Sequence, residues 1–179
     1  MSINDNGIVE TLRDNPQNGF RMLMTKYQEA VYWHIRRMVV SHDDAQDASQ
    51  ETFVRIYRSL GNYRGDCSLR SWIYRIATNE ALRLISKRRQ EEVSLDSMST
   101  GVGLIPADNY IDYDDKVAVK LQKAILSLPP KQQLAFNLRY YDDLSFEEIA
   151  KIADSTSTSI KASYHIAKEK IIKYMNSNE

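Results

Sequence analysis

The 179-residue sequence has few of the residues that form disulfides, metal sites and phosphate-binding loops. Its single cysteine, Cys67, cannot form an internal disulfide, which fits a reducing cytoplasm. Its three histidines lie far apart without a second ligand at metal spacing, so no metal site and no cofactor are predicted. The six glycines form no phosphate loop or nucleophile elbow, and no paired catalytic carboxylates appear. The sequence therefore indicates a protein that is not an enzyme.

An apolar run of transmembrane length and a signal-peptide pattern are also missing, so neither membrane insertion nor export is predicted. An excess of one charge is absent too, with 24 basic and 24 acidic residues. The charges are unevenly distributed. Residues 1–92 carry 14 basic and 12 acidic groups, residues 93–115 carry five acidic groups and no basic one, and residues 116–179 carry ten and seven. Two mildly basic blocks therefore flank an acidic strip.

The apolar residues of the first half of the chain recur at three- and four-residue steps, which predicts helices. A short helix precedes Pro16, and a long one begins near Phe20. Ser41 is a candidate N-cap for a second long helix with Gly61 at its C′ position, and Ser68 caps a third. The predicted inward positions are Phe20, Leu23, Met24, Tyr27, Val31, Ile35, Met38, Ala45, Ala48, Phe53, Ile56, Leu60, Leu69, Ile73, Ile76, Ala77, Ala81 and Leu84.

Residues 93–115 lose this periodicity and concentrate Ser, Gly, Pro and Asp, which predicts a flexible linker. The helical period returns at Lys116, and Pro129 with Pro130 ends the first helix of a C-terminal domain. The predicted inward positions of this helix and the next are Val117, Leu121, Ala124, Leu128, Leu134, Leu138 and Tyr141.

Residues 145–171 carry the pattern of a helix-turn-helix, in which Ser145 and Glu148 form a capping box and Asp154–Thr156 makes the turn. The second helix has Ile160, Tyr164, Ala167 and Ile171 as its predicted inward positions. The outward side near its start offers short polar and basic groups that can reach base edges and phosphates in a major groove. These residues are Ser157, Thr158, Lys161, Ala162 and His165. Since many helical hairpins share this pattern, the motif is only moderately specific for DNA binding.

One stripe of the helix after Ser68 carries Trp72, Arg75, Asn79 and Arg83. An aromatic plane, two guanidinium groups and an amide in a row can stack on bases, neutralise phosphates and hydrogen-bond base edges. Residues 70–89 hold six basic side chains and one acidic side chain, so this segment is strongly positive. The alternative is structural, because a tryptophan at helical spacing is usually a core residue and a charged stripe is usually a solvated face.

A resemblance to a known family favours the nucleic-acid interpretation. The run RGDCSLRSWIYRIATNEA is similar to the promoter-melting segment of the extracytoplasmic-function sigma factors, which are small bacterial transcription initiation factors. The matching positions are Trp72, Tyr74, Arg75, Ile76, Ala77 and Asn79. The resemblance implies that this helix and the loop before it contact promoter DNA. The residues assigned to that contact are Asn62, Tyr63, Arg64, Trp72, Arg75, Asn79, Arg83 and Lys87.

A second match lies in the preceding helix, where DDAQDASQETFVRIY resembles the family's segment that docks on the clamp coiled coil of RNA polymerase. The matching positions are Asp47, Gln50, Glu51, Thr52, Phe53 and Arg55. The resemblance implies polymerase binding through Asp44, Asp47, Gln50, Glu51 and Arg55. Without the resemblance, this would be an ordinary solvated face whose acids suit the helix N-terminus.

A third match begins before the helix-turn-helix, where LSLPPKQQLAFNLRYYDDLSFEEIA is similar to the family's domain that reads the minus-thirty-five element. The sequence departs from the family at residues 163–168, where relatives often carry more arginines, so fewer phosphate contacts are expected. It also departs at Asp154, which stands where a turn glycine is usual. We expect Asp154 to adopt a left-handed backbone, which Asp tolerates better than most residues.

The sequence is therefore identified as a member of this family, with an all-α fold of two small helical domains. The predicted parts are an N-terminal sigma domain at 1–92, a flexible linker at 93–115 and a helix-turn-helix domain at 116–179. The resemblance implies core RNA polymerase, promoter DNA and an anti-sigma factor as partners, in the cytoplasm. The rival hypothesis is a free-standing DNA-binding regulator whose N-terminal domain dimerises or senses a signal.

Overall fold

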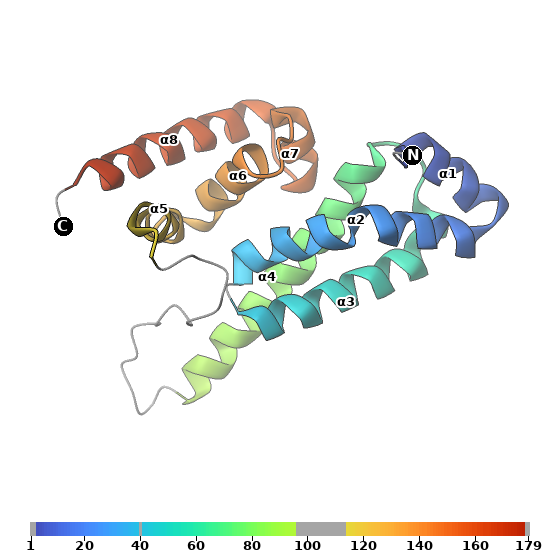
Figure 1. Cartoon of the computed structure of the whole chain (residues 1–179), viewed down its shortest axis with the longest axis horizontal. Helices are drawn as coiled ribbons and strands as arrows, with labels where there is room; N and C mark the ends of the chain where they lie inside the picture. Colours follow the sequence, from blue (N-terminus) through green and yellow to red (C-terminus); the bar gives the residue numbers. More distant parts are fainter. Residues whose placement is uncertain (1–2, 40, 96–113, 178–179) are drawn as a thin grey trace. The chain divides into compact units, whose positions relative to one another are not determined.

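A computed structural model describes residues 3–39, 41–95 and 114–177. These residues form eight α-helices and one short 3₁₀-helix, with no β-strand among them (Figure 1). The chain divides into two compact units, Met1–Pro106 and Ala107–Glu179. The predicted all-α fold with two helical domains is therefore confirmed.

The first unit consists of α1 (Asp5–Asp14), α2 (Pro16–Val39), α3 (His42–Ser59), the 3₁₀-helix η1 (Leu60–Asn62) and α4 (Leu69–Leu95). Side-chain caps explain where two of these helices begin. The Ser41 hydroxyl accepts a hydrogen bond from the Asp44 N–H at 3.4 Å, and the Ser68 hydroxyl accepts one from the Ser71 N–H at 3.1 Å. Both predicted N-caps are confirmed.

The core of the first unit lies between α2, α3 and α4, and α1 packs mainly against α2. Every inward position predicted for these helices is buried or half-buried. Leu23, Ile35, Ile56 and Ile73 are fully buried at the centre. Burying an aliphatic side chain of this size stabilises the fold by about 1.5–3 kcal/mol relative to leaving it exposed. The apolar faces therefore hold α3 and α4 side by side.

The start of α2 and the backbone conformation at Gly61 differ from the prediction, whereas α3 ends where predicted, with Leu60 as its C-cap residue and Gly61 after it. The long helix begins at Pro16 rather than near Phe20, because a proline at the first helical position needs no N–H partner. Gly61 is not a left-handed C′ residue, since α3 tightens into η1 and passes through it. The described glycine with a positive φ is Gly65, at 82°, in the loop that leads to α4.

The second unit consists of α5 (Lys116–Leu126), α6 (Pro130–Tyr140), α7 (Phe146–Ile152) and α8 (Ser157–Asn176). Asp115 caps α5, and the predicted capping box of Ser145 and Glu148 opens α7. Both α6 and α7 pack on α8, and α5 does so as well. The predicted inward residues of α8 are buried or half-buried, as are Leu121, Ala124, Leu128, Leu134 and Leu138.

The helix-turn-helix prediction is confirmed by α7 and α8, with Asp154 between them at φ 50° as expected. Val117 and Tyr141 contradict the predicted inward face, because their side chains are 66% and 39% exposed. Val117 lies in the first turn of α5, and Tyr141 is the C-cap residue of α6. The predicted linker falls mostly on residues 96–113, which lie outside the described residues, while α4 continues to Leu95.

Candidate functional site

The polar stripe predicted on α4 is on the surface. Arg75, Asn79 and Arg83 are exposed, and so is Lys87 further along the helix. The apolar residues of the same motif point the other way, since Ile73, Tyr74, Ala77 and Ala81 are buried. One helix therefore fixes two faces, an apolar face in the core and a polar face available to a ligand.

Trp72 lies between these two faces. Its side chain is half-buried against the edge of the core, and its ring centroid is 5.2 Å from that of Tyr63. The Tyr63 hydroxyl donates to the Cys67 carbonyl at 2.9 Å, which closes the loop before α4. Burial raises the pKa of Tyr63, so this phenol is a neutral donor near pH 7. Asn62 and Arg64, on either side of Tyr63 in the sequence, are exposed.

The predicted docking residues of α3 do not form one uniform surface. Asp47 and Gln50 are exposed, whereas Asp44 is half-buried and accepts a hydrogen bond from Arg88 of α4 at 2.5 Å. That bond raises the pKa of Arg88 and fixes its positive charge. Among the docking residues predicted on α3, Asp47 and Gln50 are thus the exposed acidic and amide groups.

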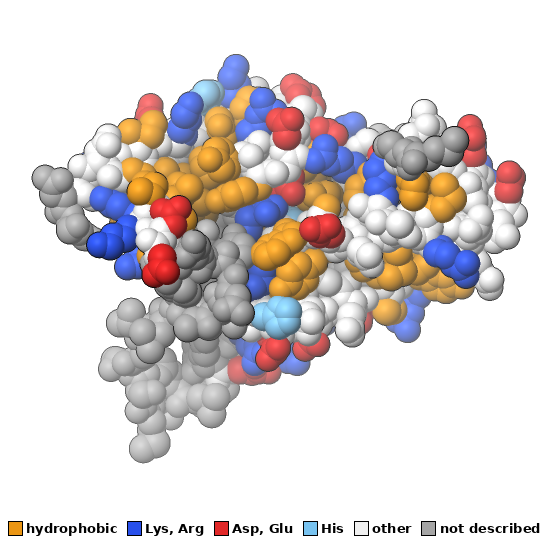
Figure 2. Space-filling view, in the orientation of Figure 1, with side chains coloured by type: hydrophobic (Ala, Val, Ile, Leu, Met, Phe, Trp, Pro, Cys, Tyr) orange, Lys and Arg blue, Asp and Glu red, His pale blue; other side chains and the backbone are white. Residues whose placement is uncertain are grey.

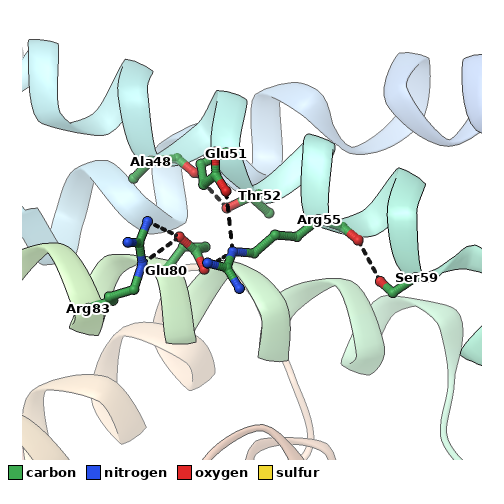
Figure 3. Close-up of polar contacts among 7 residues, drawn as sticks. All are labelled: Ala48, Glu51, Thr52, Arg55, Ser59, Glu80 and Arg83. Carbon is green, nitrogen blue, oxygen red and sulfur yellow. Dashed lines mark hydrogen bonds and ion pairs between the residues drawn. The ribbon is translucent and has the colours of Figure 1, made fainter.

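Arg55 and Glu51 belong to a network that joins α3 to α4 (Figure 3). The centre of the network is Glu80, whose side chain is only 4% exposed. One of its carboxylate oxygens pairs with Arg55, and the other accepts from Arg83 Nε at 3.1 Å and Nη2 at 2.9 Å. In the sequence, Glu80 stands out only as the one acid of the basic segment 70–89. Its spacing of three from Arg83 was the available signal.

Figure 2 shows basic and acidic side chains interspersed over the face in view, which agrees with the zero net charge of the sequence. The candidate surfaces are therefore defined by particular side chains rather than by a field of one sign. Among the described helices, none combines the length and the apolar character that crossing a bilayer requires.

The predicted DNA-reading side of α8 is also exposed. Thr158, Lys161, Ala162 and His165 are exposed, and Ser157 is half-buried at the first helical position. The His165 ring lies 5.6 Å from the Tyr164 ring and 6.5 Å from the Phe146 ring of α7. These residues make a short polar and basic face supported by aromatic side chains, which suits the edges of bases and a phosphate.

Family models match a large part of each unit. Residues 23–91 match the model described as sigma-70 region 2, and residues 118–171 match sigma-70 region 4. The first match includes α3 and most of α4, and the second includes the helix-turn-helix.

Full-length relatives and solved structures support the same family. The chain is 30% identical over 178 residues to the ECF RNA polymerase sigma-E factor of Escherichia coli K12, covering 94% of this chain and 93% of that protein. It is 29% identical to the RNA polymerase sigma-H factor of Pseudomonas aeruginosa, covering 94% and 92%.

The fold is similar to that of the sigma factor RpoE of Bartonella quintana, solved in complex with the anti-sigma factor NepR. The TM-score is 0.73, the identity is 21%, and the match covers 89% of this chain and 98% of that one. CnrH, solved in complex with the cytosolic domain of CnrY, also has a TM-score of 0.73, at 17% identity, with 98% and 99% covered. Family models for both units, together with near full-length similarity at 30% identity, lead to one conclusion. The chain belongs to the extracytoplasmic-function sigma factors of the sigma-70 family.

Proposed function

We propose that three surfaces of this sigma factor divide the steps of promoter recognition and opening. The exposed face of α3 binds core RNA polymerase, α4 with the loop before it binds the opened DNA strand, and α8 reads the upstream promoter element. One observation carries the proposal. Most apolar residues of each motif are buried or half-buried, while most of the polar residues matched to the family are exposed.

The role of α4 follows from the cost of strand separation. Opening a duplex gives up stacking of about 1.4 kcal/mol per base-pair step, so substitute contacts must be supplied. The half-buried pair of Trp72 and Tyr63 can stack at the edge of the opened region. Arg75 and Asn79 then hold the separated strand through a phosphate and a base edge, and the loop at Asn62 and Arg64 forms the pocket for a flipped base.

In the second unit, α8 lies in the major groove with its N-terminal end toward the bases. Lys161 contacts a phosphate, while Ser157, Thr158 and His165 select the sequence through base edges. Ala162, which is exposed beside them, provides a small apolar surface for a thymine methyl group.

Further properties follow from family membership. Sigma factors are non-catalytic initiation factors, and we propose no catalytic chemistry and no cofactor for this chain. The two solved relatives were each determined in complex with a partner, and one of those partners is named an anti-sigma factor. We propose that an anti-sigma factor also regulates this protein, which acts in the cytoplasm with core RNA polymerase.

The docking surface is tested by replacing its exposed acid and amide with lysines. Asp47→Lys combined with Gln50→Lys should abolish binding to core RNA polymerase, measured by pull-down with purified core enzyme. These two positions are preferable to Glu51 because both are exposed and neither belongs to the Glu80 network. Surface substitutions of this kind usually change stability by about 0.5 kcal/mol or less, so far-ultraviolet circular dichroism should stay at the wild-type value. Wild-type pull-down by the double variant would remove the docking assignment.

A second measurement separates a sigma factor from a free-standing regulator. Gel shifts with promoter DNA should require core polymerase, and they should be lost in the Asp47→Lys, Gln50→Lys variant. A specific shift by the isolated protein, unchanged in that variant, would favour the regulator. The double variant Lys170→Glu with Lys173→Glu, near the end of α8, is a control for changed surface charge. Both lysines are exposed, and neither is among the residues proposed to bind polymerase or DNA.

A further inference from the structure

One carboxylate of the first unit holds a guanidinium group from each of two helices. Glu80 projects from α4 toward α3, and its side chain is 4% exposed. Its Oε1 pairs with Nε of Arg55, which reaches across from α3, and its Oε2 accepts two hydrogen bonds from Arg83 of α4 (Figure 3). The side chains of Arg55 and Arg83 are 47% and 60% exposed. The anion is therefore inside the unit, while both cations extend to its surface.

This geometry fixes the orientation of the two guanidinium groups, while Glu80 occupies only some of their N–H donors. A guanidinium has five N–H donors in a rigid fork, and a bond from two of them to one carboxylate sets the plane of the group. Arg83 makes such a bond with Nε and Nη2. Further donors of Arg83 stay available to a phosphate. An arginine that is already ordered loses less rotamer freedom when it binds than one that moves freely in solvent.

We infer that Glu80 is a positioning residue that fixes Arg55 on the docking surface and Arg83 on the strand-binding surface. Polymerase binding and strand opening therefore depend on the same buried carboxylate. This inference rests on the function proposed for α3 and α4. A purely structural role is the alternative, but replacing a buried ion pair by an apolar group of similar volume is often neutral or stabilising. Stability alone is thus a weak reason for an acid at this position.

The experiment compares Glu80→Gln with its matched control, Glu91→Gln. Both changes remove one negative charge from α4. Glu91, however, is 48% exposed, and its ion pairs to Lys87 and Arg88 measure 3.9 and 3.8 Å. Binding to core polymerase is measured by titration, and strand opening by permanganate reactivity of promoter thymines in the holoenzyme. Glu80→Gln should weaken each by about threefold to tenfold, the cost of ordering one long side chain on binding. Glu91→Gln should change neither.

A double-mutant cycle distinguishes positioning from general destabilisation. In the Arg55→Ala background, adding Glu80→Gln should cause no further loss of polymerase affinity. In the Arg83→Ala background, it should cause no further loss of strand opening. A loss that Glu80→Gln adds in both backgrounds would be independent of the two arginines, which would overturn the inference. Glu80→Met repeats the cycle with an apolar side chain in case the glutamine variant folds poorly.

The cycle also separates this inference from the proposed function. If Arg55→Ala and Arg83→Ala weaken their respective steps while Glu80→Gln and Glu80→Met do not, the positioning role is overturned and the two surfaces stand. If Arg55→Ala and Arg83→Ala behave as wild type in both measurements, these arginines are not part of the surfaces, and the positioning role is overturned with them.

Discussion

At the scale of single residues, the first unit contains polar groups whose chemistry is set by burial. His34 is fully buried, and its Nε2 is 2.8 Å from the Thr78 hydroxyl oxygen. Its ring lies 5.1 Å from that of Tyr74, which is buried as well. Burial, and then the nearby charge of Arg37, lower the pKa of His34 from 6.5 to about 3. His34 is therefore a neutral packing and hydrogen-bonding residue near pH 7.

This lowered pKa predicts a loss of stability in acid. Between pH 6.5 and about 3, the unfolded chain binds a proton at His34 that the folded chain does not, so the free energy of unfolding falls as the pH falls through this range. At pH 5 the loss should be about 2 kcal/mol relative to neutral pH. Urea unfolding at both pH values measures it. His34→Gln should shrink the difference by that amount, whereas replacing the exposed His165 should not. An unchanged difference in His34→Gln would contradict the assignment.

At the scale of helices, periodicity predicted most of the fold because each amphipathic helix has one covered face. Ile160, Ala167 and Ile171 illustrate this on α8. Periodicity was wrong for Val117 and Tyr141, which lie at helix ends and are exposed. Periodicity carries no information on which helices lie side by side.

The candidate site was predictable to a similar extent. The exposed stripe of Arg75 and Asn79 follows from spacing along α4. The ion pair between Arg55 and Glu80 could not be predicted, because it depends on how α3 lies against α4. The bond from Arg88 to Asp44 depends on the same packing, and it occupies a residue that the family resemblance had assigned to polymerase.

The exposed stripe of α4 leads to a prediction about strand opening. Arg75→Ala and Asn79→Ala should both retain polymerase binding, because neither side chain contributes to the core and exposed polar groups are removed at little cost in stability. Both should lower the permanganate reactivity of promoter thymines, and a pre-melted bubble template should partly restore transcription. Ser86→Ala, at another exposed position of α4, serves as the control. Wild-type reactivity in both variants would show that this helix does not open the promoter.

The reader helix leads to a prediction about salt. If Lys161 contacts a phosphate, Lys161→Ala should weaken holoenzyme binding to all upstream sequences alike and lower the slope of log K against log salt by about one. Lys173→Ala, in the last turns of α8, should leave the slope unchanged. Changes at Thr158 or His165 should instead alter which sequences are preferred. A changed base preference in Lys161→Ala, with the wild-type salt slope, would exchange these roles.

At the scale of the whole molecule, each unit has a hydrophobic core of its own. The core of the first unit is formed by α1 to α4. In the second unit, Ile125, Phe136 and Ile171 belong to a cluster drawn from α5, α6 and α8. Each core is closed by helices of its own unit, so each unit has the contacts needed to fold independently.

Limited proteolysis of the free protein tests this division. Residues 93–115 have no periodic apolar face in the sequence, and segments of that composition are where proteases cut first. Trace amounts of a protease of broad specificity should therefore yield two stable fragments, which mass spectrometry places on either side of this segment. Sites within α2 to α4 should be protected, because cleavage there requires the buried face formed by residues such as Leu23, Ile35 and Ile73 to open. Early cuts between residues 20 and 90, with residues 93–115 protected, would contradict the two-domain division. The isolated C-terminal fragment should then unfold cooperatively in urea, because it contains the whole hydrophobic core of the second unit.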